Sequence, residues 1–75
     1  MITIDQLLES VDLDFEPRWV TKDKNGDICL YSEKPSLFIT GAVWQAVNDT
    51  CHCRTIGRFK IAEFEDKNTE ECIYE

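Results

Sequence analysis

Residues 18–35 read RWVTKDKNGDICLYSEKP, and this stretch predicts a β-hairpin. The pair Asn25-Gly26 is preferred in a two-residue type I′ turn, because both central positions of that turn need a positive φ. Lys24 then lies opposite Asp27, and every pair further along the two strands follows from that one. The hairpin is the strongest local signal in the chain, and the rest of the predicted fold is placed around it.

The predicted register gives the hairpin two different faces, because successive side chains of a strand point to opposite sides. We expect Trp19, Ile28 and Leu30 to point into the core. A shift of one residue in the pairing would invert these assignments. The pairs on the core face are Trp19 with Ser32, Thr21 with Leu30, and Asp23 with Ile28. The other face carries Val20, Lys22, Cys29 and Tyr31.

The residues before the hairpin predict a short amphipathic helix. Thr3 and Gln6 have the spacing of a capping box, in which each side chain bonds the main-chain N–H of the other residue. The apolar residues of the segment recur at helical spacing and share one face. They are Ile4, Leu7, Leu8 and Val11. A helix of about two turns is unstable alone in water, so we expect it to pack on the hairpin.

Two segments after the hairpin predict further strands. Residues 36–49 are rich in β-branched and aromatic residues, which favours a strand, although a short helix over residues 41–49 remains an alternative. The strand interpretation sets Trp44 on one face against Val43 and Val47 on the other. Residues 53–65 alternate in the manner of a half-buried strand. In that pattern Phe59 and Ile61 oppose Arg58, Lys60 and Ala62.

These elements predict an α+β fold, in which a short N-terminal helix packs on a small antiparallel β-meander of three to four strands. The 75 residues form one domain, with a helix and connector (1–16), the meander (17–65) and an acidic tail (66–75) whose order is left open. A chain of this length leaves no room for the enclosed cavity, several hundred Å³ in volume, that enzymes use. We therefore expect a protein that is not an enzyme.

The charge of the chain is polarised along its length. Residues 1–16 carry five acidic and no basic side chains, and residues 62–75 carry six acidic and one basic. Residues 17–61 carry seven basic and four acidic side chains, so the formal net charge of −7 comes from the two ends. An acidic chain repels the phosphate backbone, which argues against a nucleic acid as partner. The basic middle keeps one alternative open, a sheet face that stacks the bases of single strands.

No apolar run approaches the roughly 18 residues that a membrane-spanning helix needs. Residues 1–10 have no basic segment and no small-residue cleavage site, so we expect neither a signal peptide nor a membrane contact. These features predict a location in the cytosol. Cysteines there are reduced thiols in most proteins.

The stretch DTCHCRT, residues 49–55, raises the question of a metal site. A small zinc-stabilised domain could use Cys29, Cys51, Cys53 and Cys72 as its four ligands, and a metal would help so short a chain. However, structural zinc sites use cysteine pairs two to four residues apart on a turn, and Cys-x-Cys is a weaker signal. We therefore expect ordinary reduced cysteines, no metal and no other cofactor. His52 points away from its neighbours on a strand, which argues against a catalytic Cys–His pair.

Two kinds of residue are candidates for contact with a partner. One helix covers only one face of a sheet, so an aromatic residue on the other face would be exposed to a partner. The charged residues of the middle and of the acidic end offer the electrostatic complementarity that selects partners. The candidates are Tyr31, Trp44, Arg58, Lys60, Glu63 and Glu65. A homodimer formed through a sheet edge is a further alternative.

Residues 18–60 resemble small accessory proteins encoded by phages and prophages. The residues that carry the resemblance are Trp19, Asp23, Lys24, Asn25, Gly26, Tyr31, Lys34, Pro35, Trp44, Ile56 and Gly57. The resemblance implies an origin, and with it the cytosol of a bacterial host cell, and it implies no activity and no catalytic residue. We expect a small acidic protein-binding module, and in its most specific form a phage-encoded inhibitor or modulator of a host protein.

Overall fold

A computed structural model describes residues 1–38 and 43–75 of the chain. It confirms the α+β class, with one short N-terminal helix, a four-stranded sheet whose strands pair antiparallel, and a separate two-stranded sheet. The elements in chain order are α1 (Ile4–Ser10), β1 (Trp19–Lys22), β2 (Asp27–Tyr31), β3 (Ser36–Leu37), β4 (Trp44–Gln45), β5 (Cys53–Arg58) and β6 (Ile73–Tyr74). Two 3₁₀ turns, Ala62–Phe64 and Thr69–Glu71, lie between β5 and β6.

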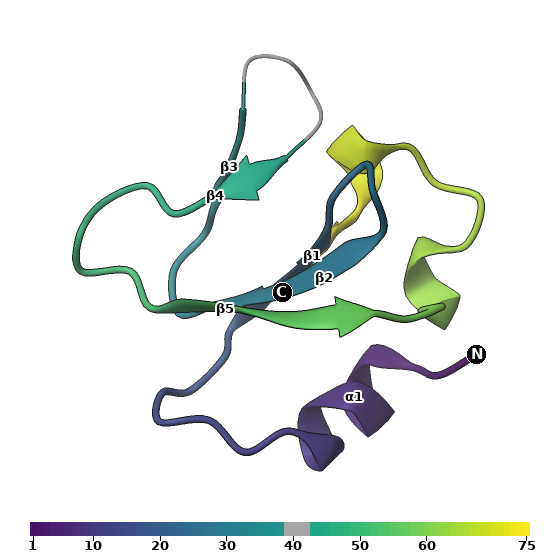
Figure 1. The fold of residues 1–75 in the computed structure, drawn as a ribbon, viewed down its shortest axis with the longest axis horizontal. Helices are drawn as coiled ribbons and strands as arrows, with labels where there is room; N and C mark the ends of the chain where they lie inside the picture. The colour runs from purple at the N-terminus through teal and green to yellow at the C-terminus, as the bar shows by residue number, and fades with distance from the viewer. Residues whose placement is uncertain (39–42) are drawn as a thin grey trace.

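The elements stack in three layers (Figure 1). The main sheet has the strand order β5-β2-β1-β6, so the hairpin formed by β1 and β2 is its centre. The helix α1 lies on one side of this sheet, and the small β3–β4 sheet lies on the other side. The strand β6 comes from the acidic tail and pairs with β1 at the edge opposite β5. The tail therefore contributes to the sheet, although its sequence left that open.

The capping box predicted for α1 is confirmed. The Gln6 N–H donates to Thr3 Oγ1 at 3.1 Å, and the Thr3 N–H donates to Gln6 Oε1 at 2.9 Å. Ile4 and Leu7 are buried on the face that meets the sheet. A second cap comes from far along the chain, because Glu63 Oε1 accepts from the Ile4 N–H at 3.0 Å. Tertiary contacts of this kind stabilise a helix too short to persist alone.

The hairpin forms as predicted, but the predicted turn and register are wrong. Asp23 pairs with Asp27 through its N–H at 2.9 Å, so the loop between the strands has three residues instead of two. Gly26 alone in this loop takes a positive φ, +97°, as in a type I turn followed by a glycine bulge. Asn25 keeps a negative φ because its side chain bonds Asp27 instead, accepting from its N–H and donating to its carboxylate, both at 3.0 Å.

The shift of one residue changes which side chains of β1 enter the core. Val20 now lies opposite Leu30, and both are buried against α1 together with Ile28. Trp19 was expected in the core, and that prediction is wrong. It is only half buried, and the Lys34 ammonium lies 5.6 Å from the centre of its ring. The core consists of Ile4, Leu7, Val20, Ile28, Leu30, Ile61, Phe64 and Cys72.

The strands predicted on either side of residue 50 are shorter than expected. In residues 36–49 the structure gives β3 and β4, which pair with each other, and the described residues 43–49 contain no helix. Residues 41 and 42 of that alternative lie outside the described part of the chain. The predicted strand over 53–65 ends at Arg58 and continues only as a bridge between Ile61 and Ile2.

Candidate functional site

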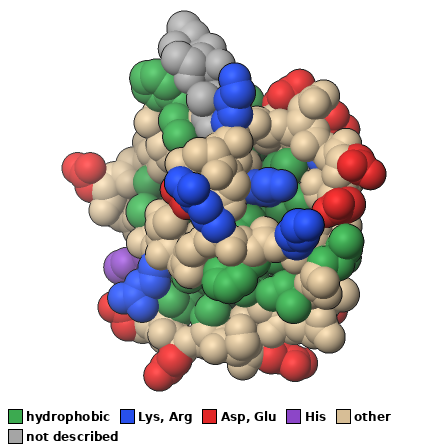
Figure 2. Space-filling view, turned by 45° about the vertical axis from the view of Figure 1, so that its right-hand side comes forward, with side chains coloured by type: hydrophobic (Ala, Val, Ile, Leu, Met, Phe, Trp, Pro, Cys, Tyr) green, Lys and Arg blue, Asp and Glu red, His purple; other side chains and the backbone are tan. Residues whose placement is uncertain are grey.

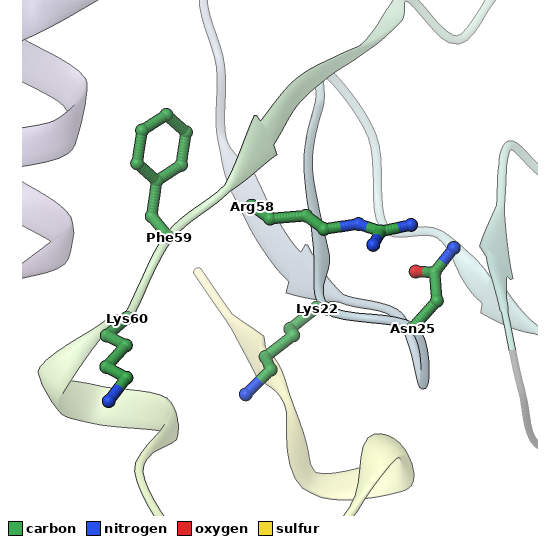
Figure 3. Close-up of a pocket in the computed structure, with 6 residues that line it drawn as sticks. Lys22, Asn25, Arg58, Phe59 and Lys60 are labelled. Atoms are coloured by element: carbon green, nitrogen blue, oxygen red, sulfur yellow. The ribbon is translucent and has the colours of Figure 1, made fainter.

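A basic pocket lies where the tip of the β1–β2 hairpin meets the end of β5 (Figure 3). It has a volume of about 290 Å³ and is open to solvent. Three of its lining residues are cationic, one from the end of β1 and two from the end of β5 and the residues after it. The lining residues are Lys22, Asn25, Gly26, Arg58, Phe59 and Lys60.

Two glycines shape this pocket. Gly57 has a φ of +125°, and a Cβ at that position would lie 3.2 Å from the ring of Phe59. Gly26 has a φ of +97°, and a Cβ at that position would lie 3.9 Å from the aliphatic carbons of the Arg58 side chain. Residues with a side chain rarely adopt such backbone angles. Gly26 lines the pocket and Gly57 directly precedes the lining residue Arg58, so glycine occupies both positive-φ positions of this region.

Arg58 is held in place by the hairpin loop. Its Nε donates to Asp27 Oδ1 at 3.0 Å, and Asn25 Nδ2 donates to Asp27 Oδ2 at the same distance. The hydrogen bond from Arg58 holds the pKa of the Asp27 carboxyl below its ordinary value. Only one of the five guanidinium N–H groups is used in this pair, and the Arg58 side chain is 67% exposed. Its remaining donors are therefore oriented and accessible to an anion.

The two lysines of the pocket have no carboxylate partner in the described residues. The chain has 15 acidic and 8 basic side chains, yet residues 1–38 and 43–75 form one ion pair, Arg58 with Asp27. In Figure 3 the amino groups of Lys22 and Lys60 extend the same way, and the Phe59 ring points in the opposite direction. Figure 2 shows Lys and Arg side chains gathered within one face, with most of the Asp and Glu side chains nearer its outline.

This geometry suits the binding of an anion. Like charges that lie close together repel each other, and an anionic group from outside relieves that repulsion. Lysine and arginine at the pocket supply charge, the oriented guanidinium supplies paired donors for a carboxylate, and the exposed Phe59 ring supplies an apolar contact. The arrangement can therefore hold an acidic group that is attached to something larger.

Two of the predicted contact residues lie in a different place. Tyr31 is buried, and its hydroxyl donates to the Trp44 carbonyl at 2.9 Å. The Trp44 N–H donates to Asp23 Oδ1 at 2.8 Å, and its indole N–H donates to the Thr69 carbonyl at 3.1 Å. These three bonds, which we call the Trp44 clamp, tie β4 to the main sheet and to the tail. Tyr31 and Trp44 thus join the two sheets and the tail.

The two predicted acidic contacts also differ from each other. Glu63 caps the start of α1, so its carboxylate is engaged inside the molecule. Glu65 is exposed. Of the six candidates, only Arg58 and Lys60 are brought together, and both line the basic pocket. Their pocket neighbours Lys22, Asn25 and Phe59 were not among the candidates. The segment IGRFK, in which a glycine precedes basic and aromatic residues, is a signal for Phe59, whereas nothing local marks Lys22 or Asn25.

The four cysteines lie apart. Cys72 is in the core beneath α1, whereas Cys29 is buried on the opposite face of the main sheet, where its Sγ lies 3.3 Å from Thr55 Oγ1. Burial raises the pKa of both thiols. Cys51 is half buried and Cys53 is exposed. Within residues 1–38 and 43–75, no three His, Cys, Asp or Glu side chains are placed to hold a metal ion.

His52 stacks on the ring of Phe15, with ring centroids 5.6 Å apart and planes at 19°. The imidazole therefore packs against the connector between α1 and β1.

Comparisons with known proteins add no relative. No family model, no curated protein and no solved structure matches the chain. In the part of the chain that the structure describes, no helix has the length and apolar character needed to cross a membrane.

Proposed function

We propose that the chain is a non-enzymatic protein-binding module whose contact surface is the basic pocket, and that its partner presents an acidic segment. The observation that carries this proposal is the meeting of Lys22, Arg58 and Lys60 around one hollow of a chain whose formal net charge is −7. Charges placed to complement a partner raise the rate of encounter and select the partner.

The choice of a protein partner over a nucleic acid follows from charge and from the aromatics. A nucleic acid carries charge along its whole length, and the acidic ends of this chain repel it. Stacking the successive bases of a single strand needs several accessible rings. Tyr31 is buried and Trp44 is engaged in the clamp, so Phe59 is the exposed ring that lines the pocket. A single acidic segment needs only the pocket and the exposed Phe59 beside it.

The biological setting that we propose rests on the resemblance of residues 18–60 to phage-encoded accessory proteins. In that setting the chain acts inside a bacterial cell as an inhibitor or modulator of a host protein. An acidic segment that normally contacts a basic ligand of the host protein is a natural target, because the pocket competes with that ligand for it.

The test is a pull-down from bacterial lysate with matched variants. The wild-type chain and Lys67→Glu should retain the same partner, because Lys67 is exposed and lies outside the pocket. The double variant Lys22→Glu with Lys60→Glu should lose it, and added salt should weaken the wild-type complex. Retention by the double variant would remove the basis for the proposal. Salt-sensitive capture of labelled oligonucleotides in place of a protein would favour the nucleic-acid alternative.

A further inference from the structure

The strand β5 forms one edge of the main sheet. Among the described strands its single neighbour is β2, and its residues Cys53, Arg54 and Thr55 are all exposed. In Figure 1 the helix α1 lies below this strand and the β3–β4 sheet lies above it, so both layers cover faces of the main sheet. An edge strand carries a row of N–H and C=O groups that point away from the sheet.

The register shows which main-chain groups point outward. The Ser32 N–H donates to the His52 carbonyl at 2.9 Å, so His52 directs its main chain toward β2. Because residues of an antiparallel strand alternate in this respect, Arg54 also bonds toward β2, whereas Cys53 and Thr55 point their N–H and C=O groups outward. Among the described residues, no hydrogen bond reaches the main-chain groups of Cys53 or Thr55 from that outer side.

Just after β5, the outward main-chain groups of the chain already pair with another segment, the N-terminal residues around Ile2. The Ile2 N–H donates to the Lys60 carbonyl at 3.0 Å, and the Ala62 N–H donates to the Ile2 carbonyl at 2.8 Å. Residues 60 and 62 follow β5 and use the outward positions of the alternation. The start of the free stretch is bounded by the stack of Phe15 on His52. Cys53 to Thr55 is therefore a short open edge between two occupied positions.

The charges beside this edge specify its occupant. Arg54 lies opposite the core residue Leu30, whereas Arg58 lies opposite Asp27 because the pairing shifts by one residue between them. The shift sends the two guanidinium groups to opposite faces of the sheet. An added strand would therefore meet a cation on each of its faces, and at the Arg58 end it would reach the basic pocket. Carboxylates on the added strand would pair with these cations.

We infer that the outer edge of β5 takes an extended acidic segment of the partner as an additional strand, so that recognition occurs by strand addition. This inference rests on the proposed function and names how the partner is held. Main-chain hydrogen bonds at Cys53 and Thr55 would supply affinity, and Arg54, Arg58 and the pocket lysines would select acidic sequences.

A second copy of the chain is a poorer occupant. Pairing Cys53 of one copy with Thr55 of another uses both outward residues, and it places Arg54 directly opposite Arg54. Like charges at opposed positions of a sheet are destabilising. Two chains that each carry a formal charge of −7 also repel each other at long range. A homodimer through this edge, left open by the sequence, is thus disfavoured.

Amide hydrogen exchange of the full chain tests the inference. The probe is a synthetic octapeptide of valine and glutamate with glutamates on both faces of the strand, and the control replaces each glutamate with glutamine. With the acidic peptide, exchange at Cys53 and Thr55 should slow by about tenfold or more, whereas Arg54, already bonded to β2, should change little. The neutral peptide should give no such protection.

Two variants keep the test sharp. Arg54→Glu should abolish the protection by the glutamate peptide and should accept a lysine peptide instead. Cys53→Pro removes an outward N–H without touching the ladder to β2, so it should weaken binding relative to Cys53→Ala. Peptide binding that depends on Lys22 and Lys60 but leaves Cys53 and Thr55 unprotected would overturn strand addition and leave the proposed function standing. Absence of peptide binding would overturn both the inference and its premise, whereas a dimer joined through β5 would overturn the inference alone.

Discussion

The two faces of the main sheet are held by different forces. On the α1 side, Val20, Ile28, Leu30 and Phe64 are nearly free of solvent and make an apolar core. On the β3–β4 side, the buried residues include the polar Thr21 and Asp23, and hydrogen bonds to the main chain and indole of Trp44 fix the second sheet in place. The stability of the first face depends on buried apolar area and packing, whereas that of the second depends on the direction of hydrogen bonds and on the charge of Asp23. They should therefore fail under different changes.

The largest effect is expected on the apolar face. Phe64→Ala removes a side chain that is 2% exposed and leaves a cavity beneath α1, at a cost of about 3–5 kcal/mol in the free energy of unfolding. Small domains have a total of roughly 5–15 kcal/mol, so the variant should lose a large share of its stability. Urea denaturation followed by circular dichroism measures the loss. Phe59→Ala is the matched control, because its ring is 44% exposed. Equal losses for the two variants would contradict this view of the core.

The polar face should respond less, and locally. Asp23→Ala takes away the acceptor of the Trp44 N–H, and an unpaired buried donor costs about 1–3 kcal/mol. We expect β4 to loosen from the sheet while β1 and β2 stay paired. The fluorescence of the two tryptophans and the amide exchange of Trp44 would report the loosening. Uniform loss of protection in β1, β2 and β4 together would show that the two faces are not separable.

The stability should depend on pH through two carboxyl groups, Asp23 and Asp27, which lie on opposite sides of the hairpin loop. Burial raises the pKa of Asp23 above 3.8, so its charged form is disfavoured by folding, and its effect on stability improves as the pH falls through that raised value. The pKa of Asp27 is lowered by its bond with Arg58, so the stability that it contributes is lost as the pH falls through its folded pKa.

The variant Asp23→Asn separates these two contributions. An asparagine keeps an oxygen for the Trp44 N–H and carries no charge, so the variant should match or exceed the stability of the wild type at neutral pH. That advantage should shrink as the medium becomes acidic. Urea titrations at a series of pH values would measure it, and a variant whose disadvantage grows toward neutral pH would contradict the assignment.

The smallest effect is expected at Thr21. Its Oγ1 is buried and has no hydrogen-bond partner among the described residues. Valine has nearly the same shape, so Thr21→Val should leave the free energy of unfolding unchanged or raise it by about 1 kcal/mol. Thermal unfolding would show this. A marked destabilisation would mean that the hydroxyl takes part in the clamp.

The comparison also explains what could be predicted from the sequence. The helix cap needed only Thr3 and Gln6, and the existence of the hairpin needed only the turn residues, because these signals are local. The register depended on whether the Asn25 side chain would bond to Asp27. The usual backbone preference of Asn-Gly predicted a two-residue turn, whereas the structure has a three-residue loop. One such choice moved Val20 into the core and Trp19 out of it.

The candidate site was predicted in part for the same reason. Arg58 and Lys60 were candidates as charged residues of the basic middle, whereas Lys22 joins them only because the hairpin pairs with β5. Tyr31 and Trp44 were expected on a bare sheet face. The β3–β4 sheet covers that face, and no local pattern in residues 36–49 indicates where it packs.

The binding of an acidic segment by the basic pocket is tested most directly by the affinity of the valine–glutamate peptide, measured by titration calorimetry. We predict an affinity that falls as salt rises from about 50 to about 200 mM, because screening weakens charge contacts. The double variant Lys22→Glu with Lys60→Glu should bind at least about tenfold more weakly, and Lys67→Glu should bind as the wild type does. An affinity that is the same for all three proteins, or that is indifferent to salt, would contradict the account.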